Sequence, residues 1–323
     1  MGLKLPDRWI WDSWYVKDGD TYHAFYLCAS RGLGDPNRRH RSPSVGHAIS
    51  KDLRNWQILP DAITPSDEPG FDSWTTWTGS TIQDDNGKWW MFYTGSSRED
   101  GGLIQRIGAA TSDDMITWTK LPGGASDRSM VSADSTWYEL LDTSPEPVWH
   151  DQAWRDPWVF RFPHDQSTWH MLITARSKVG NPRTRGVVGH ATSTNLIDWK
   201  VQPPLSEPDQ GFGQNEVFQF EIVDGVPILL FCCDWPELSV ENQKLWGQIC
   251  TTYSVVVDEN LKHIDFNRAQ PFLQQQVYAG RLINGPDGWY LVGFINMVEG
   301  KFVGEICDPI PVTADPTLGI VPR

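Results

Sequence analysis

"GHAISKDLRNW" (residues 46–56), "GAATSDDMITW" (108–118) and "GHATSTNLIDW" (189–199) are three near-copies of one pattern. Their shared form is G-x-A-x-S-x-(D/N)-(L/M)-x-x-W. It is typical of a strand, a turn that an Asp or Asn side chain begins, and a Trp that opens the next strand. Because the internal spacing is constant, the pattern predicts a repeating architecture.

A second unit precedes each copy and occurs five times in the chain. It consists of a polar start, a strand, a turn that often contains Asp-Gly or Asn-Gly, and an aromatic-rich strand, as in "DSWYVKDGDTYHAFYL". Asp-Gly and Asn-Gly adopt the positive φ angles that tight hairpins need, so each unit predicts a β-hairpin. The five units begin at Asp12, Ser80, Asp156, Glu216 and Tyr278.

Two hairpin strands followed by two more strands make a four-stranded sheet, and five repeats make five sheets. We therefore predict an all-β fold: one five-bladed β-propeller with four-stranded blades, which fills residues 1–323 and surrounds a central channel. A β-sandwich would not explain the constant internal spacing. No C-terminal β-sandwich is expected. Segment 121–150 breaks the pattern and predicts a long surface loop or insertion, and the stretch after Phe294 is expected to close the ring against the first blade.

The composition limits the possible partners. The formal net charge is −14 and the pI about 4.9, which argues against nucleic acid or an anionic membrane as a partner. No apolar run approaches the roughly 18 residues that a membrane span requires. No cofactor and no metal are predicted, and a homo-oligomer stays possible.

Cysteine usage and the N-terminus bear on the compartment. The start, "MGLKLPDRW", lacks the apolar region of a signal peptide. The five cysteines are an odd number without metal-type spacing, and Cys232 and Cys233 lie in an apolar run typical of a buried strand. A reducing, cytoplasmic setting is expected, with secretion open if a signal peptide was removed.

The start of each innermost strand lies at one mouth of a propeller channel, so the five unit starts should converge there. Three of the five are carboxylic acids, an arrangement that suits a hard cation or glycoside hydrolysis. Calcium prefers six to eight oxygens and loop spacing such as D-x-D-x-D, which the chain lacks. The many tryptophans favour a sugar, whose faces stack on indole rings. The predicted aromatic surround consists of Trp11, Trp14, Trp77, Trp154 and Trp158.

Four motifs in order resemble the β-fructosidase superfamily of invertases, levanases, inulinases and levansucrases: "WIWDSW" at 9–14, "WTGS" at 77–80, "WRDPWVF" at 154–160 and "NEVFQFE" at 215–221. The resemblance implies that Asp12 is the nucleophile, Asp156 the transition-state stabiliser and Glu216 the general acid/base. Residues predicted to contact the sugar are Trp11, Trp77, Thr78, Ser80, Arg155, Gln219 and Tyr278.

The implied reaction is retaining cleavage of a fructose-containing saccharide through a covalent fructosyl-enzyme, which water or a sugar hydroxyl then resolves. Arg155 is expected to keep Asp156 ionised. Family members usually carry E-C-P or E-R-P at the acid/base, whereas this chain has Glu216-Val217-Phe218, which leaves Glu221 as an alternative acid. Strand alternation should point Glu221 to the opposite side of the sheet, so Glu216 is preferred.

Two other functions stay open at this point. The first is an inverting arabinan or xylan hydrolase on the same scaffold, with carboxylates roughly 6.5–9.5 Å apart rather than roughly 5–5.5 Å. The second is a non-catalytic sugar-binding propeller.

His47 and His190, in equivalent "GHA" repeats, are interpreted as structural, and the basic cluster 31–41 as a solvated loop that could reach an acceptor subsite. The preferred substrate and the acceptor are not determined.

Overall fold

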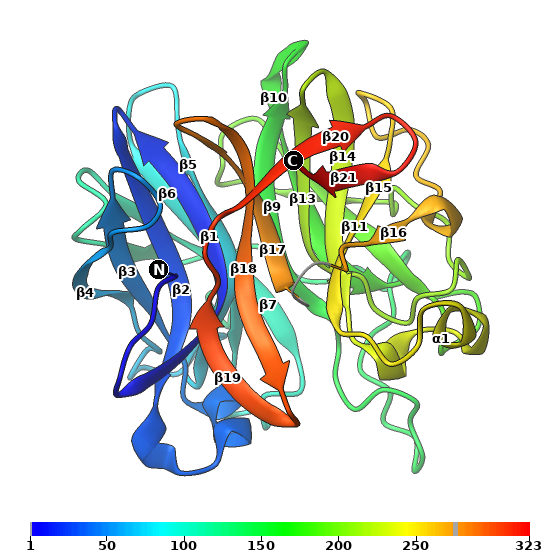
Figure 1. Ribbon diagram of the computed structural model, residues 1–323. Coiled ribbons are helices and arrows are strands. Elements are labelled where there is room, and N and C mark those ends of the chain that lie inside the picture. The colour runs from blue at the N-terminus through cyan, green and yellow to red at the C-terminus, as the bar shows by residue number, and fades with distance from the viewer. Residues whose placement is uncertain (1, 274–276) are drawn as a thin grey trace.

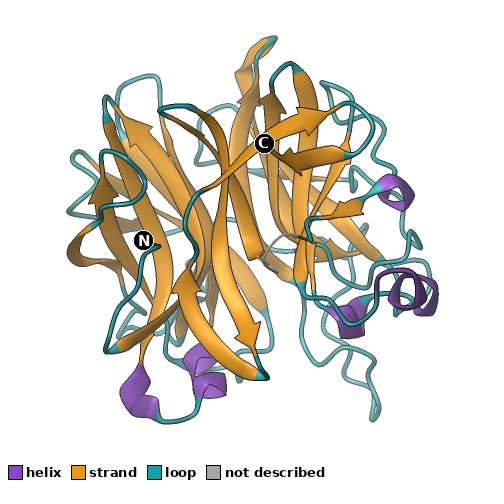
Figure 2. Ribbon diagram, in the orientation of Figure 1, coloured by secondary structure: helices purple, strands orange, loops and turns teal. Residues whose placement is uncertain are grey.

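The computed structural model describes residues 2–273 and 277–323. Five antiparallel sheets, each made from consecutive strands, form a five-bladed β-propeller (Figures 1 and 2). The predicted fold class is therefore confirmed. Among the described residues, no helix has the length and apolar character that a membrane span requires.

The blades follow the order of the chain from the innermost strand outward. Blade 1 contains β1 (Arg8–Asp18), β2 (Thr21–Ser30), β3 (Ser44–Ser50) and β4 (Gln57–Ile63), and blade 2 contains β5 (Thr75–Gln83), β6 (Trp89–Ser96), β7 (Gln105–Ser112) and β8 (Thr119–Leu121). Blade 3 contains β9 (Trp154–Phe162), β10 (Asp165–Arg176), β11 (Gly186–Ser193) and β12 (Lys200–Gln202). Blade 4 contains β13 (Glu216–Val223), β14 (Val226–Cys233), β15 (Thr251–Val256) and β16 (Gln270–Pro271).

Blade 5 departs from the four-stranded pattern. It contains β17 (Val277–Gly285), β18 (Gly288–Val298), β20 (Ile310–Asp315) and β21 (Gly319–Pro322), and an extra strand, β19 (Lys301–Ile306), also pairs with β18. β19 contacts β1, so this part of the last stretch closes the ring as predicted. β20 and β21 do not, because they pair with β18 and with each other as the outer strands of blade 5.

The repeated eleven-residue motif forms the turn between the third and fourth strands of a blade. In blade 1, Asp52 Oδ1 accepts hydrogen bonds from the backbone N–H groups of Arg54 (2.9 Å) and Asn55 (2.7 Å). The next residue, Leu53, has a φ of 61° and is buried, as are Met115 (58°) and Leu196 (65°) in the other copies. Burial of these side chains offsets the strain of a left-handed backbone, which explains the apolar residue after the Asp or Asn.

Segment 121–150 is an irregular insertion that joins blades 2 and 3, as predicted. Val131 forms a bridge with Ile107, and Tyr138 forms one with Ser177. The Tyr138 hydroxyl donates to the carbonyl of Gln202 at 2.8 Å. The insertion is therefore anchored on both blades.

The helical turns in the part of the chain that the structure describes are few. They are α1 (Val240–Trp246) and the 3-10 turns η1 (Arg31–Leu33), η2 (Pro36–Arg41), η3 (Trp235–Glu237) and η4 (Phe266–Arg268). The segment with η1 and η2 and the segment with α1 both lie at the lower end of the view in Figure 1. All five cysteines are free, and Cys232 and Cys233 are buried in β14 as predicted.

Candidate active site

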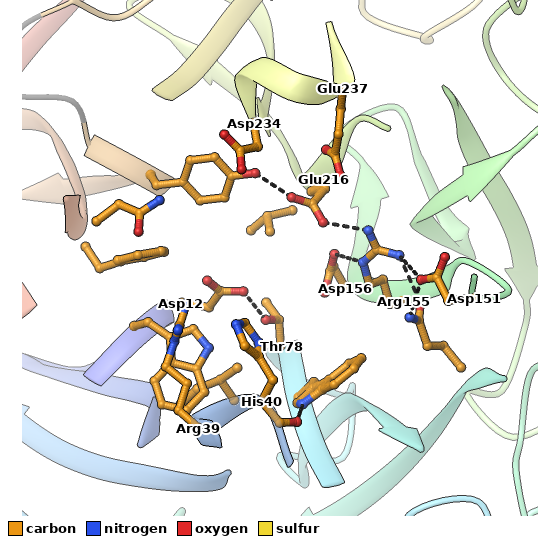
Figure 3. A pocket seen from close by; sticks show the side chains of 18 residues that line it. Asp12, Arg39, His40, Thr78, Asp151, Arg155, Asp156, Glu216, Asp234 and Glu237 are labelled. Carbon is orange, nitrogen blue, oxygen red and sulfur yellow. Dashed lines mark hydrogen bonds and ion pairs between the residues drawn. The ribbon is translucent and has the colours of Figure 1, made fainter. Parts of the chain in front are cut away.

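A pocket of about 350 Å³ lies where the innermost strands of all five blades begin (Figure 3). Eight of the predicted site residues line it: Trp11, Asp12, Trp77, Thr78, Arg155, Asp156, Glu216 and Tyr278. Ser80 and Gln219 do not line it. The expected convergence of Asp12, Asp156 and Glu216 is present.

A β-bulge in every innermost strand aims side chains into this pocket. The extra residue is Asp12 in β1 and Thr78 in β5, each unpaired between two residues that keep their partners. In β9, β13 and β17, two consecutive residues lie opposite a single residue of the neighbouring strand. The first residue of each such pair has a positive φ: 59° at Asp156, 59° at Val217 and 48° at Ala279. A bulge bends the strand and redirects the neighbouring side chains.

The sequence repeat aligned Asp12 of blade 1 with Ser80 of blade 2, and the positions of the bulges show that this alignment is wrong. The counterpart of Asp12 in blade 2 is Thr78, two residues before Ser80. Ser80 is buried and its Oγ accepts the backbone N–H of Val159 at 3.1 Å. Its role lies in holding blade 3 against blade 2, outside the pocket.

Gln219 and Glu221 lie further along β13. Gln219 donates to the carbonyl of Leu282 at 2.9 Å and accepts its N–H at 2.8 Å, which joins blades 4 and 5. Its Nε2 also contacts Glu221 Oε1 at 3.2 Å. Strand alternation was expected to place Glu221 on the face opposite Glu216. The bulge between Glu216 and Gln219 breaks this alternation, so the expectation was wrong. Glu221 nevertheless stays outside the pocket that Glu216 lines.

Asp12 accepts a short hydrogen bond from the Thr78 hydroxyl (Figure 3). Burial raises the pKa of the Asp12 carboxyl. The Thr78 hydrogen bond and the charge of Arg281 oppose this rise, and the charge of Glu216 adds to it. Thr78 therefore favours the ionised form that a nucleophile requires.

Asp156 is buried beside Arg155, with 3.5 Å between Asp156 Oδ2 and Arg155 Nε. Its Oδ2 also accepts a hydrogen bond from the Thr174 hydroxyl at 2.8 Å. Burial nevertheless raises the pKa of Asp156 to about 7. The expectation that Arg155 keeps this acid ionised therefore holds only above neutral pH, because loss of water outweighs the ion pair.

Arg155 connects the acids of blades 3 and 4. Its guanidinium donates to Gln105 at 2.9 Å, to Gln214, and to Glu216 Oε1 at 2.5 Å. The other oxygen of Glu216 accepts a hydrogen bond from the Tyr278 hydroxyl. A phenol can also accept a hydrogen bond, so the same contact persists when Glu216 carries a proton.

Arg281 of β17 is a buried cation that the sequence analysis missed. It donates to the carbonyls of Val217 (3.2 Å) and Phe218 (2.5 Å), and its guanidinium lies 4.9 Å from the Trp158 ring centroid. Nε and Nη2 find no hydrogen-bond partner among the described residues. Burial lowers the pKa of Arg281 to about 10, against the opposing charges of Asp156 and Asp12.

The predicted tryptophan surround is only partly present. Trp11 and Trp77 line the pocket, whereas Trp14, Trp154 and Trp158 do not. Trp14 is fully buried, stacks on Phe25 and donates from Nε1 to Thr81 at 3.0 Å. Trp14 and Trp154 are buried, and the half-buried Trp158 packs on Arg281, so these three rings belong to the core. The bulges at Asp12 and Asp156 interrupt the alternation that would otherwise place the rings on the same face as these acids.

Seven further polar residues of the pocket were not predicted as site residues: Arg39, His40, Gln105, Asp151, Asp234, Glu237 and Asn296. Arg39 and His40 belong to the basic cluster 31–41, which reaches the pocket on the side of Asp12 (Figure 3). The Arg39 guanidinium lies 3.8 Å from the ring centroid of Phe302 and 5.5 Å from that of Trp11.

Asp234 follows β14 directly, and Glu237 ends the turn η3 that comes next. Because β14 runs antiparallel to β13, it ends at the mouth of the channel where β13 begins. An acid immediately after the second strand of a hairpin was the signal that could have found Asp234. Burial raises the pKa of Glu237 to about 8, and the charge of Glu216 adds to this rise. Within residues 2–273 and 277–323, no group of three or more His, Cys, Asp or Glu side chains is arranged to hold a metal ion.

His47 and His190 lie outside the pocket. His47 Nε2 is 3.0 Å from His23 Nδ1, and His190 Nε2 is 3.0 Å from His170 Nδ1, with the rings of each pair stacked. Burial lowers the pKa of His47 and of His190 to about 3. These pairs support the structural interpretation of the "GHA" repeats.

The sequence matches the family described as "Glycosyl hydrolases family 32 N-terminal domain" over residues 9–301. It is 30% identical to a sucrose-6-phosphate hydrolase of Escherichia coli over 217 residues, which cover 65% of this chain and 38% of that protein. It is 29% identical to a 6(G)-fructosyltransferase of Asparagus officinalis, over 64% of this chain and 30% of that protein. The chain thus spans less than two fifths of these relatives' length.

Solved structures with the same fold include an inulosucrase from Halalkalicoccus jeotgali bound to kestose, with a TM-score of 0.75 and 19% identity, covering 98% of this chain and 87% of that chain. A family 32 β-fructofuranosidase of Bombyx mori has a TM-score of 0.73 and 18% identity, covering 100% of this chain and 64% of that chain. At these identities the likeness concerns the fold alone.

Proposed function

The chain belongs to glycosyl hydrolase family 32, and from this premise we propose that it is a retaining β-fructofuranosidase or fructosyltransferase. The proposed substrates are sucrose, fructans or small fructo-oligosaccharides. One propeller spanning residues 1–323 would carry the whole active site. The five free cysteines support a reducing compartment, which we propose to be the cytoplasm.

One observation carries the proposal: Asp12, Asp156 and Glu216 meet in one pocket, each with different partners. Asp12 has a hydroxyl donor, Asp156 has a hydroxyl and a guanidinium, and Glu216 has a guanidinium and a phenol. Carboxylates in different environments can take the different roles that glycoside hydrolysis requires.

In the first step, Glu216 gives its proton to the glycosidic oxygen while the bond from that oxygen to the anomeric carbon breaks. An oxygen of the Asp12 carboxylate forms the new bond to the anomeric carbon from the opposite face. The products are a fructosyl ester on Asp12 and a free leaving sugar.

In the second step, the ionised Glu216 takes a proton from water or from a sugar hydroxyl, whose oxygen attacks the anomeric carbon. The ester bond breaks and its electron pair returns to the Asp12 carboxylate. Two displacements at one carbon restore its original configuration. Asp156 would hold sugar hydroxyls, and its ionised form would strengthen those bonds as positive charge develops on the ring.

Product analysis tests the proposal. The protein is incubated separately with sucrose, inulin and levan, and the products are separated by chromatography. Free fructose indicates hydrolysis, longer or cyclised oligomers indicate transfer, and no product from any fructoside would refute the proposal. Proton NMR of the first-formed product of transfer, or of methanolysis, should show the retained anomer, whereas an inverted anomer would favour the single-displacement alternative.

Asp12→Asn provides the matched test of the nucleophile. The amide keeps the shape of the carboxylate but cannot attack the anomeric carbon, so turnover should fall by several orders of magnitude while the protein stays folded. Circular dichroism and binding of fructose check the fold and the pocket. Hydrolysis retained at the wild-type rate would exclude Asp12 as the nucleophile.

A further inference from the structure

The pocket has two sides of different charge. Figure 3 shows Asp12, Thr78, Arg39 and His40 on one side and Glu216, Asp234 and Glu237 on the other. Burial lowers the pKa of His40 to about 4, so at neutral pH the unpaired positive charge of the pocket is that of Arg39. That charge lies on the side of Asp12.

The leaving sugar of the proposed reaction belongs on the side of Glu216. A displacement at the anomeric carbon places the attacking oxygen and the leaving oxygen on opposite faces of the ring. With Asp12 below the ring, the leaving oxygen points toward Glu216, which must reach it to donate its proton. Asp234 and Glu237 therefore border the space that the leaving sugar occupies.

Both of these acids lack a cationic partner in the described part of the chain. Asp234 Oδ1 accepts the backbone N–H of Trp235 at 2.7 Å and contacts the thiol of Cys250. Glu237 Oε1 accepts from Gln214 at 3.0 Å, and its Oε2 has no hydrogen-bond partner among the described residues.

The nearest cation on this side, Arg155, has no free capacity for a ligand anion. Its Nη1 donates to Gln105 and lies 3.6 Å from Asp151, and its Nη2 donates to Gln214 and Glu216. Its Nε faces Asp156 at 3.5 Å. An anionic group arriving here would have to displace a carboxylate from this guanidinium.

We infer that the leaving-group side of the pocket selects neutral, unphosphorylated sugars and rejects a sugar phosphate. The inference rests on the proposed function and names its substrate class. Sugar hydroxyls can donate to Asp234 and to the free oxygen of Glu237, whereas a phosphate offers no donor when fully ionised and carries about −1.5 to −2 charges at pH 7. Like charges facing each other in a recessed site discriminate strongly against the wrong ligand.

The summed charge of the residues that line the pocket is also negative. The pocket is lined by six acids and two arginines, a formal balance of −4 that is reached above the pKa of Glu237, about 8, with His40 neutral. The whole chain carries −14. An anionic substrate is therefore repelled both during its approach and at the leaving-group side.

The test compares kcat/KM for sucrose with kcat/KM for sucrose phosphorylated at the 6-position of its glucosyl unit. Sucrose is expected to be the better substrate by at least about 100-fold, and the ratio should shrink at 0.5 M KCl, which screens the repulsion. The comparison with Glu237→Gln is made at pH 9, where Glu237 is ionised because this pH lies above its pKa of about 8. The ratio is then expected to shrink by about tenfold, because one of the facing charges is removed.

Glu241→Gln is the matched control. Glu241 lies in α1, outside the pocket, so this variant makes the same change in net charge and should leave the ratio unchanged. Thermal melts verify that both variants are folded, and Asp234→Asn provides a second neutralisation if Glu237→Gln does not fold.

The outcomes separate the two proposals. Equal or faster cleavage of the phosphorylated sucrose, or an equal change in the ratio for both glutamine variants, would overturn the inference and leave the fructosidase assignment intact. No cleavage of any fructoside would instead refute the proposed function, and the inference with it.

Discussion

Thr78→Val removes the hydrogen bond that the Thr78 hydroxyl donates to the Asp12 carboxylate, with almost no change in side-chain volume. Thr78 is buried, so water cannot easily replace the lost donor. Burial already raises the pKa of Asp12, and this hydrogen bond is the largest influence that opposes the rise. We therefore expect the pKa of Asp12 to rise further in the variant.

The size of the shift follows from the energy of the bond. A hydrogen bond to a charged group contributes about 1.5–3 kcal/mol. One pKa unit corresponds to about 1.4 kcal/mol, so the pKa of Asp12 should rise by about one to two units. The part of the acid limb of kcat/KM that Asp12 sets should move to higher pH by the same amount, whereas the part that Asp156 sets should stay in place. Activity should fall about 10- to 100-fold below that limb and much less at pH 9.

The assay is the initial rate of fructose release from sucrose or another cleaved fructoside, measured from pH 4.5 to 9. Thr81→Val is the matched control, because Thr81 lies on the same strand and its Oγ1 accepts from Trp14 Nε1, away from the acids. Thr81→Val should lower the melting temperature and leave the pH profile unchanged. An unshifted acid limb in Thr78→Val, or an equal shift in both variants, would refute the reasoning.

Three other expectations concern the buried charges. Because burial raises the pKa of Asp156 to about 7, wild-type kcat/KM should fall by about tenfold per pH unit below pH 7, and a flat profile from pH 5 to 7 would contradict a role for its ionised form. Arg281→Met removes a cation that lowers the pKa of Asp12 and Asp156, so the acid limb should move to higher pH and kcat/KM at pH 7 should fall at least about tenfold; an unchanged profile in the folded variant would exclude this influence. The pKa of His190 is lowered to about 3 in the folded chain, from about 6.5 when unfolded, so the unfolded state binds more protons at acidic pH. The stability that neutral His190 provides above pH 6.5 is therefore lost as pH falls, by up to about 1.4 kcal/mol per pH unit. Urea unfolding at pH 7.5, 6 and 5 should therefore show a smaller acid loss in His190→Phe than in wild type, and parallel losses would contradict this linkage.

Much of the fold could be predicted because a propeller repeats its local signals. The eleven-residue motif encodes a turn through contacts within a few residues, such as Asp52 with the next backbone N–H groups. Local signals of this kind are readable in one sequence. The extra strand β19 was missed, because it occurs once and pairs with β18 through a hairpin that no other blade shares.

The candidate site was predicted in its charged centre and in the aromatic residues Trp11, Trp77 and Tyr278, but not in the polar residues that loops and short turns contribute. Asp12, Asp156 and Glu216 lie within recognisable motifs at the starts of the innermost strands. Arg39 lies in the 3-10 turn η2 and Glu237 in the 3-10 turn η3, and the sequence spacing of either residue to Asp12 carries no information. Only the packing of the blades brings them to one mouth.

The sequence by itself determined the number of blades and placed Asp12, Asp156 and Glu216 at the channel mouth, because these features depend on repeated short-range patterns. The tertiary structure alone decided which partners those acids have. The bulges that replace Ser80 with Thr78 as the partner of Asp12, and the buried Arg281, depend on register and on neighbours more than 60 residues away. The pKa values and the charge of each side of the pocket depend on burial and distance, which spacing along a chain does not specify.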